Sequence, residues 1–251
     1  MVHIVGAGCG APDLITLRGR NFLETADVII YAGSLVNKEL LQYAKKGARI
    51  FDSAKMTLEE TTAVIAEAEA NGETTVRLHS GDSSLYGAIG EQIRELNKLG
   101  IEYDITPGVS SFCGAAAALK TEYTLPGVSQ TVIISRAAGN APVPEKESVA
   151  SLAAHRATMV LFLSASLAEQ VENDLIRGGY PPDTPAAIVY KATWEDEKIL
   201  RCTLGTLART AKENGITKTA LITVGDFLES EFTRSHLYDG AFSTEYRKAK
   251  K

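Results

Sequence analysis

The sequence predicts an α/β fold built from two α/β domains with an inter-domain cleft. Short apolar runs rich in β-branched residues alternate with stretches of helical periodicity, which is typical of sheets covered by helices. Several runs in the first half end in glycine turns, and a small-residue segment divides the runs into two sets. A chain of 251 residues can form two domains of ordinary size. We place them at residues 1–115 and 122–240.

The first domain is predicted from strands and helices that alternate along the chain. The strand segments are HIVGA, VIIYA, ARIFD, TTVRLH and IEYDITP, at residues 3–7, 28–32, 48–52, 74–79 and 101–107. Apolar residues at helical spacing occupy residues 14–26, 37–46, 58–72 and 88–100. The last two helical segments end in Asn-Gly or Leu-Gly, as helix C-termini often do. Because strand and helix alternate throughout, this sheet should be largely parallel.

The second domain has more strands than helices. A small-residue helix and a turn in residues 107–127 lead into strand segments at residues 131–136, 158–164, 185–192, 197–205 and 219–227. Only two clear helical patterns, at residues 166–179 and 206–215, separate these strands. Strands that follow one another without a helix pair antiparallel, so we expect a mixed sheet here.

Composition excludes several classes of function. The net charge of −5 argues against a broad basic face for nucleic acid. No apolar run approaches the roughly 20 residues that span a bilayer, and the chain opens on VHIVGAG without a basic leader, so we expect a cytoplasmic protein that does not bind membranes. The three cysteines lack the spacing of a disulfide framework or a zinc site, and we expect no bound metal.

The opening loop has two possible interpretations. Gly6, Gly8 and Ala11 fit the G-x-G-x-x-G/A pattern of dinucleotide-binding loops. However, the second strand ends at Ala32 where a ribose-binding acid is expected, and Pro12 delays the helix that should face a pyrophosphate. The loop is therefore either a tight structural turn or a turn that lets a ligand approach the backbone closely.

Two further glycine turns favour a ligand site. The segment RLHSGDSSLYGA, residues 77–88, passes from a strand through a Gly-Asp-Ser turn into a helix, and TPGVSS, residues 106–111, does the same. Open α/β sheets bind ligands at the carboxyl ends of their strands, where these turns should lie. Helix capping by Asp82 is the simpler alternative for the first of them.

These segments resemble the tetrapyrrole methylase family, whose members transfer methyl groups from S-adenosylmethionine to corrin and porphyrin precursors. The resemblance rests on VGAGCGAPDLITLRG, YAGSLV, RLHSGDSSLYGA, PGVSS and VYKATWEDE, in order and spacing, and extends from about residue 2 to 230. Within the family, YAGSLV, ISRAAGNAPVPE, LAAHRATMVLFLS and ATWEDE favour the members that methylate carbon 11 of precorrin-4 or cobalt-precorrin-4 in cobalamin biosynthesis. The family resemblance implies the tetrapyrrole methylase fold and a homodimer.

The resemblance also implies a binding site for the methyl donor in the inter-domain cleft. Carried over position by position, the donor contacts are Cys9, Ser80, Gly81, Asp82, Leu85, Ser110 and Ser111 in the first domain, and Leu163, Ser164 and Ala192 in the second. Proline often stands at the positions of Cys9 and Ser83 in the family. Uroporphyrinogen methylases have a Tyr-Asp pair whose aspartate is a proposed proton acceptor. The corresponding pair here is Tyr31-Ala32, and the missing carboxylate argues against uroporphyrinogen as substrate.

A precorrin carries a rim of carboxylates, so an acidic enzyme needs local positive charge where it docks. We expect Lys55 and Arg136 to bind substrate, because each follows a predicted strand. By analogy with a lysine of uroporphyrinogen methylases, Lys55 is also the candidate catalytic proton donor; no other catalytic residue is identified. His79 and His155 are expected to be structural. The alternatives are another precorrin methylase of the same fold, a nicotinamide-dependent precorrin reductase, or a non-catalytic tetrapyrrole-binding protein.

Overall fold

The structure is a computed structural model that describes residues 1–229, 231–235 and 238–249. The chain divides into two compact units. The first comprises Met1–Ala115 and Lys191–Glu197, and the second comprises Ala116–Tyr190 and Lys198–Lys251. The segment Lys191–Glu197, which we expected in the second domain, therefore groups with the first unit. It does so because its side chains contact the opening loop, as described below.

The first unit contains a parallel sheet of five strands in the order β3-β2-β4-β1-β5. The strands are β1 (Val2–Gly6), β2 (Val28–Tyr31), β3 (Arg49–Asp52), β4 (Thr75–His79) and β5 (Tyr103–Thr106). The helices are α1 (Leu17–Thr25), α2 (Leu58–Ala70), α3 (Ile89–Leu99) and the start of α4 (Ser111–Leu119), which continues into the second unit. Because all five strands are parallel, all of their carboxyl ends lie at one edge of the sheet.

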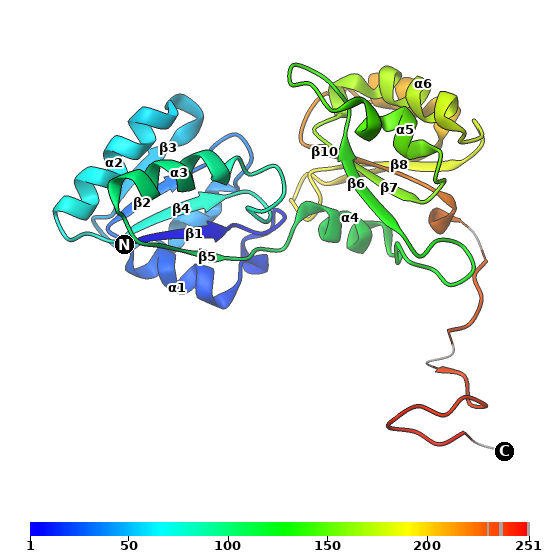
Figure 1. Cartoon of the computed structure of the whole chain (residues 1–251), viewed down its shortest axis with the longest axis horizontal. Coiled ribbons are helices and arrows are strands. Elements are labelled where there is room, and N and C mark those ends of the chain that lie inside the picture. Colours follow the sequence, from blue (N-terminus) through cyan, green and yellow to red (C-terminus); the bar gives the residue numbers. More distant parts are fainter. Residues whose placement is uncertain (230, 236–237, 250–251) are drawn as a thin grey trace. The chain divides into compact units, whose positions relative to one another are not determined.

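Helices cover both faces of this sheet, and two separate cores result (Figure 1). On one face, Ile4 and Ile30 pack with Ile65 of α2 and Leu96 of α3. On the other face, the strand residues Val5, Ile29, Val76 and Leu78 pack with Leu23 of α1 and with residues of the following loops. The strands read as continuous apolar runs because both of their faces are buried.

Local sequence signals fix the ends of the helices. Thr57 and Glu60 form a reciprocal capping box at the start of α2. Thr16 caps α1 by accepting a hydrogen bond from the backbone N–H of Gly19. Gly100 ends α3 in the left-handed conformation, with a φ of 67°.

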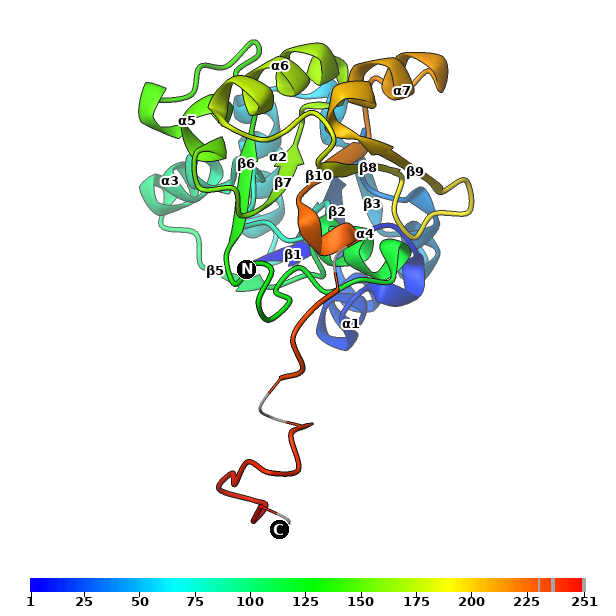
Figure 2. The ribbon, with the colours of Figure 1, turned by 90° about the vertical axis from the view of Figure 1, so that its right-hand side faces the viewer.

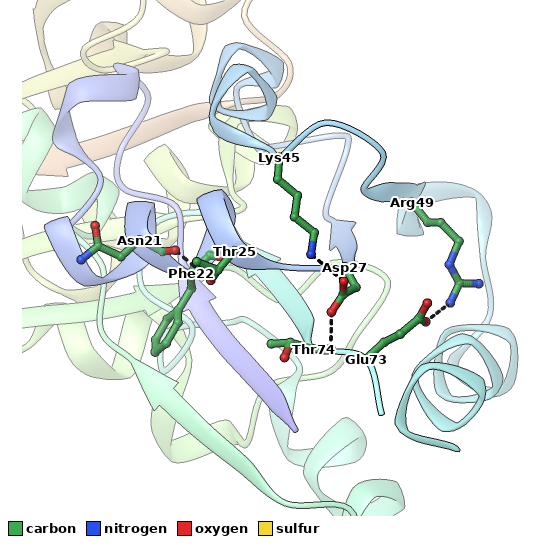
Figure 3. Close-up of polar contacts among 8 residues, drawn as sticks. All are labelled: Asn21, Phe22, Thr25, Asp27, Lys45, Arg49, Glu73 and Thr74. Atoms are coloured by element: carbon green, nitrogen blue, oxygen red, sulfur yellow. Dashed lines mark hydrogen bonds and ion pairs between the residues drawn. The ribbon is translucent and has the colours of Figure 1, made fainter. Parts of the chain in front are cut away.

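Ion pairs join the strands at the opposite, amino edge of the sheet (Figure 3). One carboxylate oxygen of Asp27 lies 2.5 Å from Lys45 Nζ, and the other accepts a hydrogen bond of 2.9 Å from the backbone N–H of Thr74. Arg49 pairs with Glu73 and with Glu67. The hydrogen bond from Lys45, followed by that from Thr74, lowers the pKa of Asp27. These contacts hold the starts of β2, β3 and β4 together, far from the carboxyl edge.

The second unit contains a mixed sheet of five strands in the order β6-β7-β10-β8-β9, which can be followed in Figure 2. The elements are β6 (Val132–Arg136), α5 (Val149–Ala153), β7 (Thr158–Phe162), α6 (Ala168–Gly178), β8 (Pro185–Tyr190), β9 (Lys198–Thr203), α7 (Leu207–Glu213) and β10 (Ala220–Val224). β6 and β7 are parallel, whereas β10 is antiparallel to β7 and β8, and β9 is antiparallel to β8. This confirms the mixed sheet, and α5, α6 and α7 contribute to one core on it.

Two elements differ from the sequence prediction. The segment predicted as a helix at residues 37–46 forms only a 3₁₀ helix, η2 (Lys38–Tyr43), which buries Leu40 alone and ends in extended backbone at Ala44. Leu41, Tyr43 and Ala44 are only partly buried against the same core, and this packing does not support an α-helix there. Conversely, a helix was expected to include His155, whereas α5 ends at Ala153, and its five residues are too few to show a helical period. Within the described part of the chain, no helix is both long and apolar enough to cross a membrane.

Candidate functional site

Three glycines meet at the carboxyl edge of the first sheet, one from the end of each of three neighbouring strands. Gly6 ends β1, Gly81 follows β4 and Gly108 follows β5. A Cβ atom on Gly108 would lie 2.1 Å from the carbonyl oxygen of Gly81 and 2.7 Å from Cα of Gly6, and a Cβ on Gly6 would lie 2.6 Å from Cα of Gly108. The backbones are therefore in direct contact, and no side chain fits between them.

Backbone hydrogen bonds lock the first two turns to each other. The N–H of Gly8 donates to the carbonyl oxygen of Gly81 at 3.2 Å, and the N–H of Gly81 donates back to Gly8 at 2.9 Å. Ala7 donates to the carbonyl oxygen of His79 at 2.7 Å. Gly8 and Gly81 have φ values of 83° and 60°, which side chains rarely adopt. The glycine pattern of the opening loop is thus explained by its pairing with the turn after β4.

Asp82 joins the second turn to the third. Its Oδ2 atom accepts a hydrogen bond of 2.8 Å from the backbone N–H of Gly108, and its Oδ1 atom accepts from the backbone N–H and the hydroxyl of Ser84. Partial burial by itself would raise the pKa of Asp82, but these hydrogen bonds outweigh it and lower the pKa. Both carboxylate oxygens are committed to the turns, so Asp82 positions backbone in addition to any contact with a ligand.

The start of α4 completes this edge. A Cβ atom on Gly81 would have only ordinary contacts, the nearest being 3.5 Å from Ser110 Cα and Ser111 N. Ser110 is buried and its carbonyl oxygen accepts the N–H of Cys113 at 3.0 Å. The structure therefore brings Gly81 and Asp82 together with Ser110 and Ser111, while Ser80 and Leu85 flank the same turn in sequence.

Cys9 and Ala192 also come together, because both lie against Gly114 in α4. A Cβ atom on Gly114 would lie 3.0 Å from Cys9 Sγ and 3.4 Å from Ala192 Cβ. Thr193 donates a hydrogen bond of 3.7 Å to Cys9 Sγ and accepts one of 3.0 Å from the N–H of Ala11. Burial raises the pKa of the Cys9 thiol, and the hydrogen bond from Thr193 opposes that effect. The thiol is therefore a packed neutral group rather than a nucleophile.

The backbone of the segment Lys191–Glu197 is strained in this position. Lys191 and Thr193 have φ values of 47° and 69°, and a β-branched residue such as Thr193 rarely occupies that region. The ring of Trp194 lies against Gly10, where an added Cβ would be 2.2 Å from Cδ1. Sequence reasoning missed both Thr193 and Trp194, although the glycine at position 10 was a possible signal of close approach.

His79 lies buried directly before the second turn. Burial, and then the positive charge of Arg77, lower its pKa to about 3. Its Nε2 atom has no hydrogen-bond partner among the described residues. The imidazole is therefore neutral near pH 7.

The predicted site residues of the second unit lie at one edge of the mixed sheet. Ser164 is fully buried; its hydroxyl accepts the N–H of Ala137 at 2.8 Å and donates to the carbonyl oxygen of Phe162 at 2.7 Å. Leu163 is 60% exposed and has a φ of 54°. Arg136 donates to the carbonyl oxygens of Ala141 at 3.0 Å and Pro142 at 2.8 Å, so its guanidinium holds its own loop.

Lys55 lies at the end of the short 3₁₀ helix η3 (Ser53–Lys55), which follows β3, and it is exposed. It is therefore at the carboxyl edge of the first sheet, on the β3 side of the glycine turns. No group of three or more metal-ligating side chains occurs among the residues that the structure describes.

Comparison with known proteins identifies the family. The family model of tetrapyrrole (corrin/porphyrin) methylases matches residues 1–208. A Methanocaldococcus jannaschii protein named cobalt-precorrin-4 C(11)-methyltransferase is 55% identical over 251 residues, which cover 100% of this chain and 97% of that protein. The X-ray structure of a cobalamin biosynthetic enzyme, cobalt precorrin-4 methyltransferase, superposes with a TM-score of 0.89 at 45% identity, covering 91% of this chain and 96% of the other.

A uroporphyrin-III C-methyltransferase from Thermus thermophilus, solved in complex with S-adenosyl homocysteine, has a TM-score of 0.77 at 25% identity, and the match covers 91% of this chain and 93% of that one. The two structural matches cover nearly the whole chain, so the likeness includes both sheets. The chain belongs to the tetrapyrrole (corrin/porphyrin) methylase family.

Proposed function

We propose that the protein transfers a methyl group from S-adenosylmethionine to carbon 11 of precorrin-4, or of its cobalt complex, in cobalamin biosynthesis. The observation that carries this proposal is the 55% identity, over the whole chain, with a protein named for that reaction. The match covers 100% of this chain, so it extends through the segments ISRAAGNAPVPE and ATWEDE on which the resemblance to these members rests. The match to a solved enzyme of the same name supports the same conclusion.

The glycine turns of the first unit fit the methyl donor. Turns without side chains leave backbone at the carboxyl edge of the sheet open to a flat nucleoside. We propose that the donor contacts Cys9, Ser80, Gly81, Asp82, Leu85, Ser110, Ser111 and Ala192. Donor contacts by Leu163 and Ser164 of the second unit stay a prediction from the family resemblance.

The chemistry asks for alignment more than for strong acid or base catalysis. S-adenosylmethionine supplies a methyl group already activated by its sulfonium. The chain then contributes by holding the donor with backbone groups in a rigid site. Proximity and orientation of two bound reactants can lower a reaction barrier by roughly 7–11 kcal/mol. The double anchoring of Asp82 and the backbone contact of Gly6 with Gly108 provide that rigidity.

Substrate binding requires positive charge near the donor. We propose that Lys55 contacts a carboxylate of the macrocycle, because it is exposed at the same edge of the sheet and has no ion pair among the described residues. Arg136 is proposed as a second contact, although two carbonyl oxygens of its own loop already occupy part of its guanidinium.

Incubation of the purified protein with S-adenosylmethionine and either metal-free precorrin-4 or cobalt-precorrin-4 tests the activity. We expect S-adenosylhomocysteine to form and one of the two substrates to gain the mass of one methyl group at carbon 11. A methyl group at another carbon would indicate a different precorrin methylase. Nicotinamide oxidation without methyl transfer would indicate a reductase, and an unchanged bound tetrapyrrole would indicate a binding protein.

We also infer from the family resemblance that the protein acts as a homodimer in the cytoplasm. Sedimentation equilibrium of the purified protein would test the assembly, and cell fractionation would test the location. A monomer at concentrations well above the cellular one would contradict the first inference.

A further inference from the structure

The proposed reaction releases a proton, and the structure indicates which group takes it. This inference rests on the function proposed above. The S–CH₃ bond breaks with its electron pair left on sulfur, and an enamine-type carbon of the macrocycle supplies the pair for the new C–CH₃ bond. In metal-free precorrin-4, the charge that results on the conjugated ring nitrogen disappears when its N–H proton leaves. A carboxylate at the correct place can accept that proton.

Most carboxylates near the carboxyl edge of the first sheet are already engaged. Both oxygens of Asp82 accept hydrogen bonds within the glycine turns. Glu197 accepts the N–H of Thr193 at 2.6 Å, and Asp196 pairs with Lys191 at 2.6 Å. Asp13 is exposed to water on the 3₁₀ helix η1 (Pro12–Leu14). Asp52 is different from all of these.

Asp52 is the last residue of β3, and only one of its oxygens is in use. Oδ1 accepts a hydrogen bond of 3.0 Å from the N–H of Ala54, which caps η3. Oδ2 has no hydrogen-bond partner among the described residues, and the side chain is half-buried. The adjacent Ser53 hydroxyl donates to the carbonyl oxygen of Tyr31 at 3.1 Å, so this turn is tied to the end of β2.

The carboxylate of Asp52 lies directly against Gly33. A Cβ atom on Gly33 would be 2.1 Å from Oδ1 and 2.5 Å from Oδ2. Asp52 pairs in register with Tyr31, the last residue of β2, so Asp52 and Gly33 both lie at the carboxyl edge. Gly33 therefore makes room for a carboxylate beside the loop after β2, where the chain carries no acid of its own at Ala32.

The position is compatible with a macrocycle bound next to the donor. In the sheet order, β2 separates β3 from β4, and Tyr31 pairs with both Asp52 and Leu78. Strands lie about 4.8 Å apart, so Asp52 is about 10 Å from the end of β4, where the donor turn begins. A ring of four pyrrole-derived units with its carboxylate side chains spans a gap of this size, and Lys55 lies three residues farther along the same turn.

We propose that Asp52 is the catalytic proton acceptor of this enzyme, with Gly33 providing the space that holds its carboxylate in place. The proton passes from the ring N–H to Oδ2 as the C–CH₃ bond forms and is released to water after the product leaves. The simpler alternative is that Asp52 only caps η3. Asparagine keeps that cap through its side-chain oxygen but cannot accept the proton, so it separates the two roles.

The test compares Asp52→Asn with Asp13→Asn, a matched change of an exposed carboxylate at the same edge. Single-turnover methyl transfer should slow by about 10²- to 10⁴-fold in Asp52→Asn, the range for loss of a general base. Binding of S-adenosylhomocysteine, measured by calorimetry, should not change. In Asp52→Ala, added formate should restore part of the rate, whereas formate should not affect the Asp13→Asn enzyme.

A second variant displaces the Asp52 carboxylate by changing its neighbour, Gly33. Gly33→Ala should push the flexible Asp52 side chain out of place and slow methyl transfer, while Gly90→Ala, where an added Cβ meets nothing within 4 Å, should leave the rate unchanged. A wild-type enzyme that methylates neither substrate would overturn the proposed function and this role with it. An active wild type would overturn the Asp52 role alone if Asp52→Asn kept the wild-type rate, or if formate failed to rescue Asp52→Ala.

Discussion

The two units of the protein each contain a five-stranded sheet, but the loops that carry the predicted site residues are held in different ways in the two units. In the first unit all strands are parallel, and the glycine turns after β1, β4 and β5 are in backbone contact. In the second unit β6, β7 and β8 share one direction, opposite to β9 and β10. There, the side chains of Arg136 and Ser164 hold the loops by hydrogen bonds to backbone.

This difference determines what each edge tolerates. Where glycine backbones touch, adding one carbon atom forces main chain apart, because no side chain is available to move. Where a side chain holds a loop, its removal leaves an unpaired backbone group but creates no collision. We therefore expect changes in the first unit's turns to affect both stability and donor binding, and changes in the second unit to act locally.

The largest effect is expected for Gly108→Ala. Its Cβ would lie 2.1 Å from the carbonyl oxygen of Gly81, which is backbone and cannot rotate away. Overpacking typically costs 1–3 kcal/mol and can cost more, so we expect a loss of about 3 kcal/mol in the free energy of unfolding and loss of S-adenosylhomocysteine binding. Urea denaturation and calorimetry measure the two. Gly90→Ala is the control, and a Gly108→Ala protein with wild-type affinity would contradict the close packing of the turns.

Ser164→Ala should have the next largest effect, confined to the second unit. It removes the hydroxyl that accepts the N–H of buried Ala137, and no other acceptor for this N–H occurs among the described residues. An unsatisfied buried donor costs about 1–3 kcal/mol, which urea denaturation can detect. Ser166→Ala, at an exposed serine two residues away, is the matched control. Equal stability of the two variants would show that the hydroxyl of Ser164 does not hold this loop.

His79 gives the stability of the first unit a pH dependence. The pKa of His79 is lowered to about 3, below the unfolded value of about 6.5, so below pH 6.5 the unfolded state binds a proton that the folded state does not. The stability contribution is complete above pH 6.5 and is lost as pH falls toward 3, at about 1.4 kcal/mol per pH unit. Unfolding at pH 7.0 and 5.5 should show a smaller pH effect in His79→Gln than in wild type. A full wild-type pH effect in His79→Gln would contradict the assignment.

The smallest stability effect is expected for Arg136→Ala. It removes hydrogen bonds to two carbonyl oxygens of an exposed loop, which should cost about 0.5–1.5 kcal/mol. If Arg136 also binds a substrate carboxylate, KM for the tetrapyrrole should rise by roughly ten- to a hundredfold at low salt, because a hydrogen bond to a charged group contributes about 1.5–3 kcal/mol. Arg209→Ala is the control at an exposed arginine. An unchanged KM with a loosened loop would show that Arg136 serves its own loop alone.

Local patterns in the sequence determined the fold class, the family and most of the elements. The alternation of apolar runs with helical periods predicted the parallel first sheet and the mixed second sheet, since these patterns follow directly from which faces each element buries. Thr57 with Glu60 and the terminal Gly100 marked helix ends for the same local reason. Residues 37–46 show the limit, because a helical pattern without enough buried partners forms only a 3₁₀ helix.

Contacts between residues far apart in the chain could be decided only by the tertiary structure. No local pattern places Thr193 on Cys9, or moves Lys191–Glu197 into the first unit, because those contacts join residues more than 180 positions apart. The same holds for Asp52 against Gly33, where strand register brings together two turns that the sequence shows only as separate strand ends. The burial pattern and the helical or strand period are properties of one segment, so the sequence of that segment shows them. A binding site depends on the distances between segments, and these are set by tertiary packing.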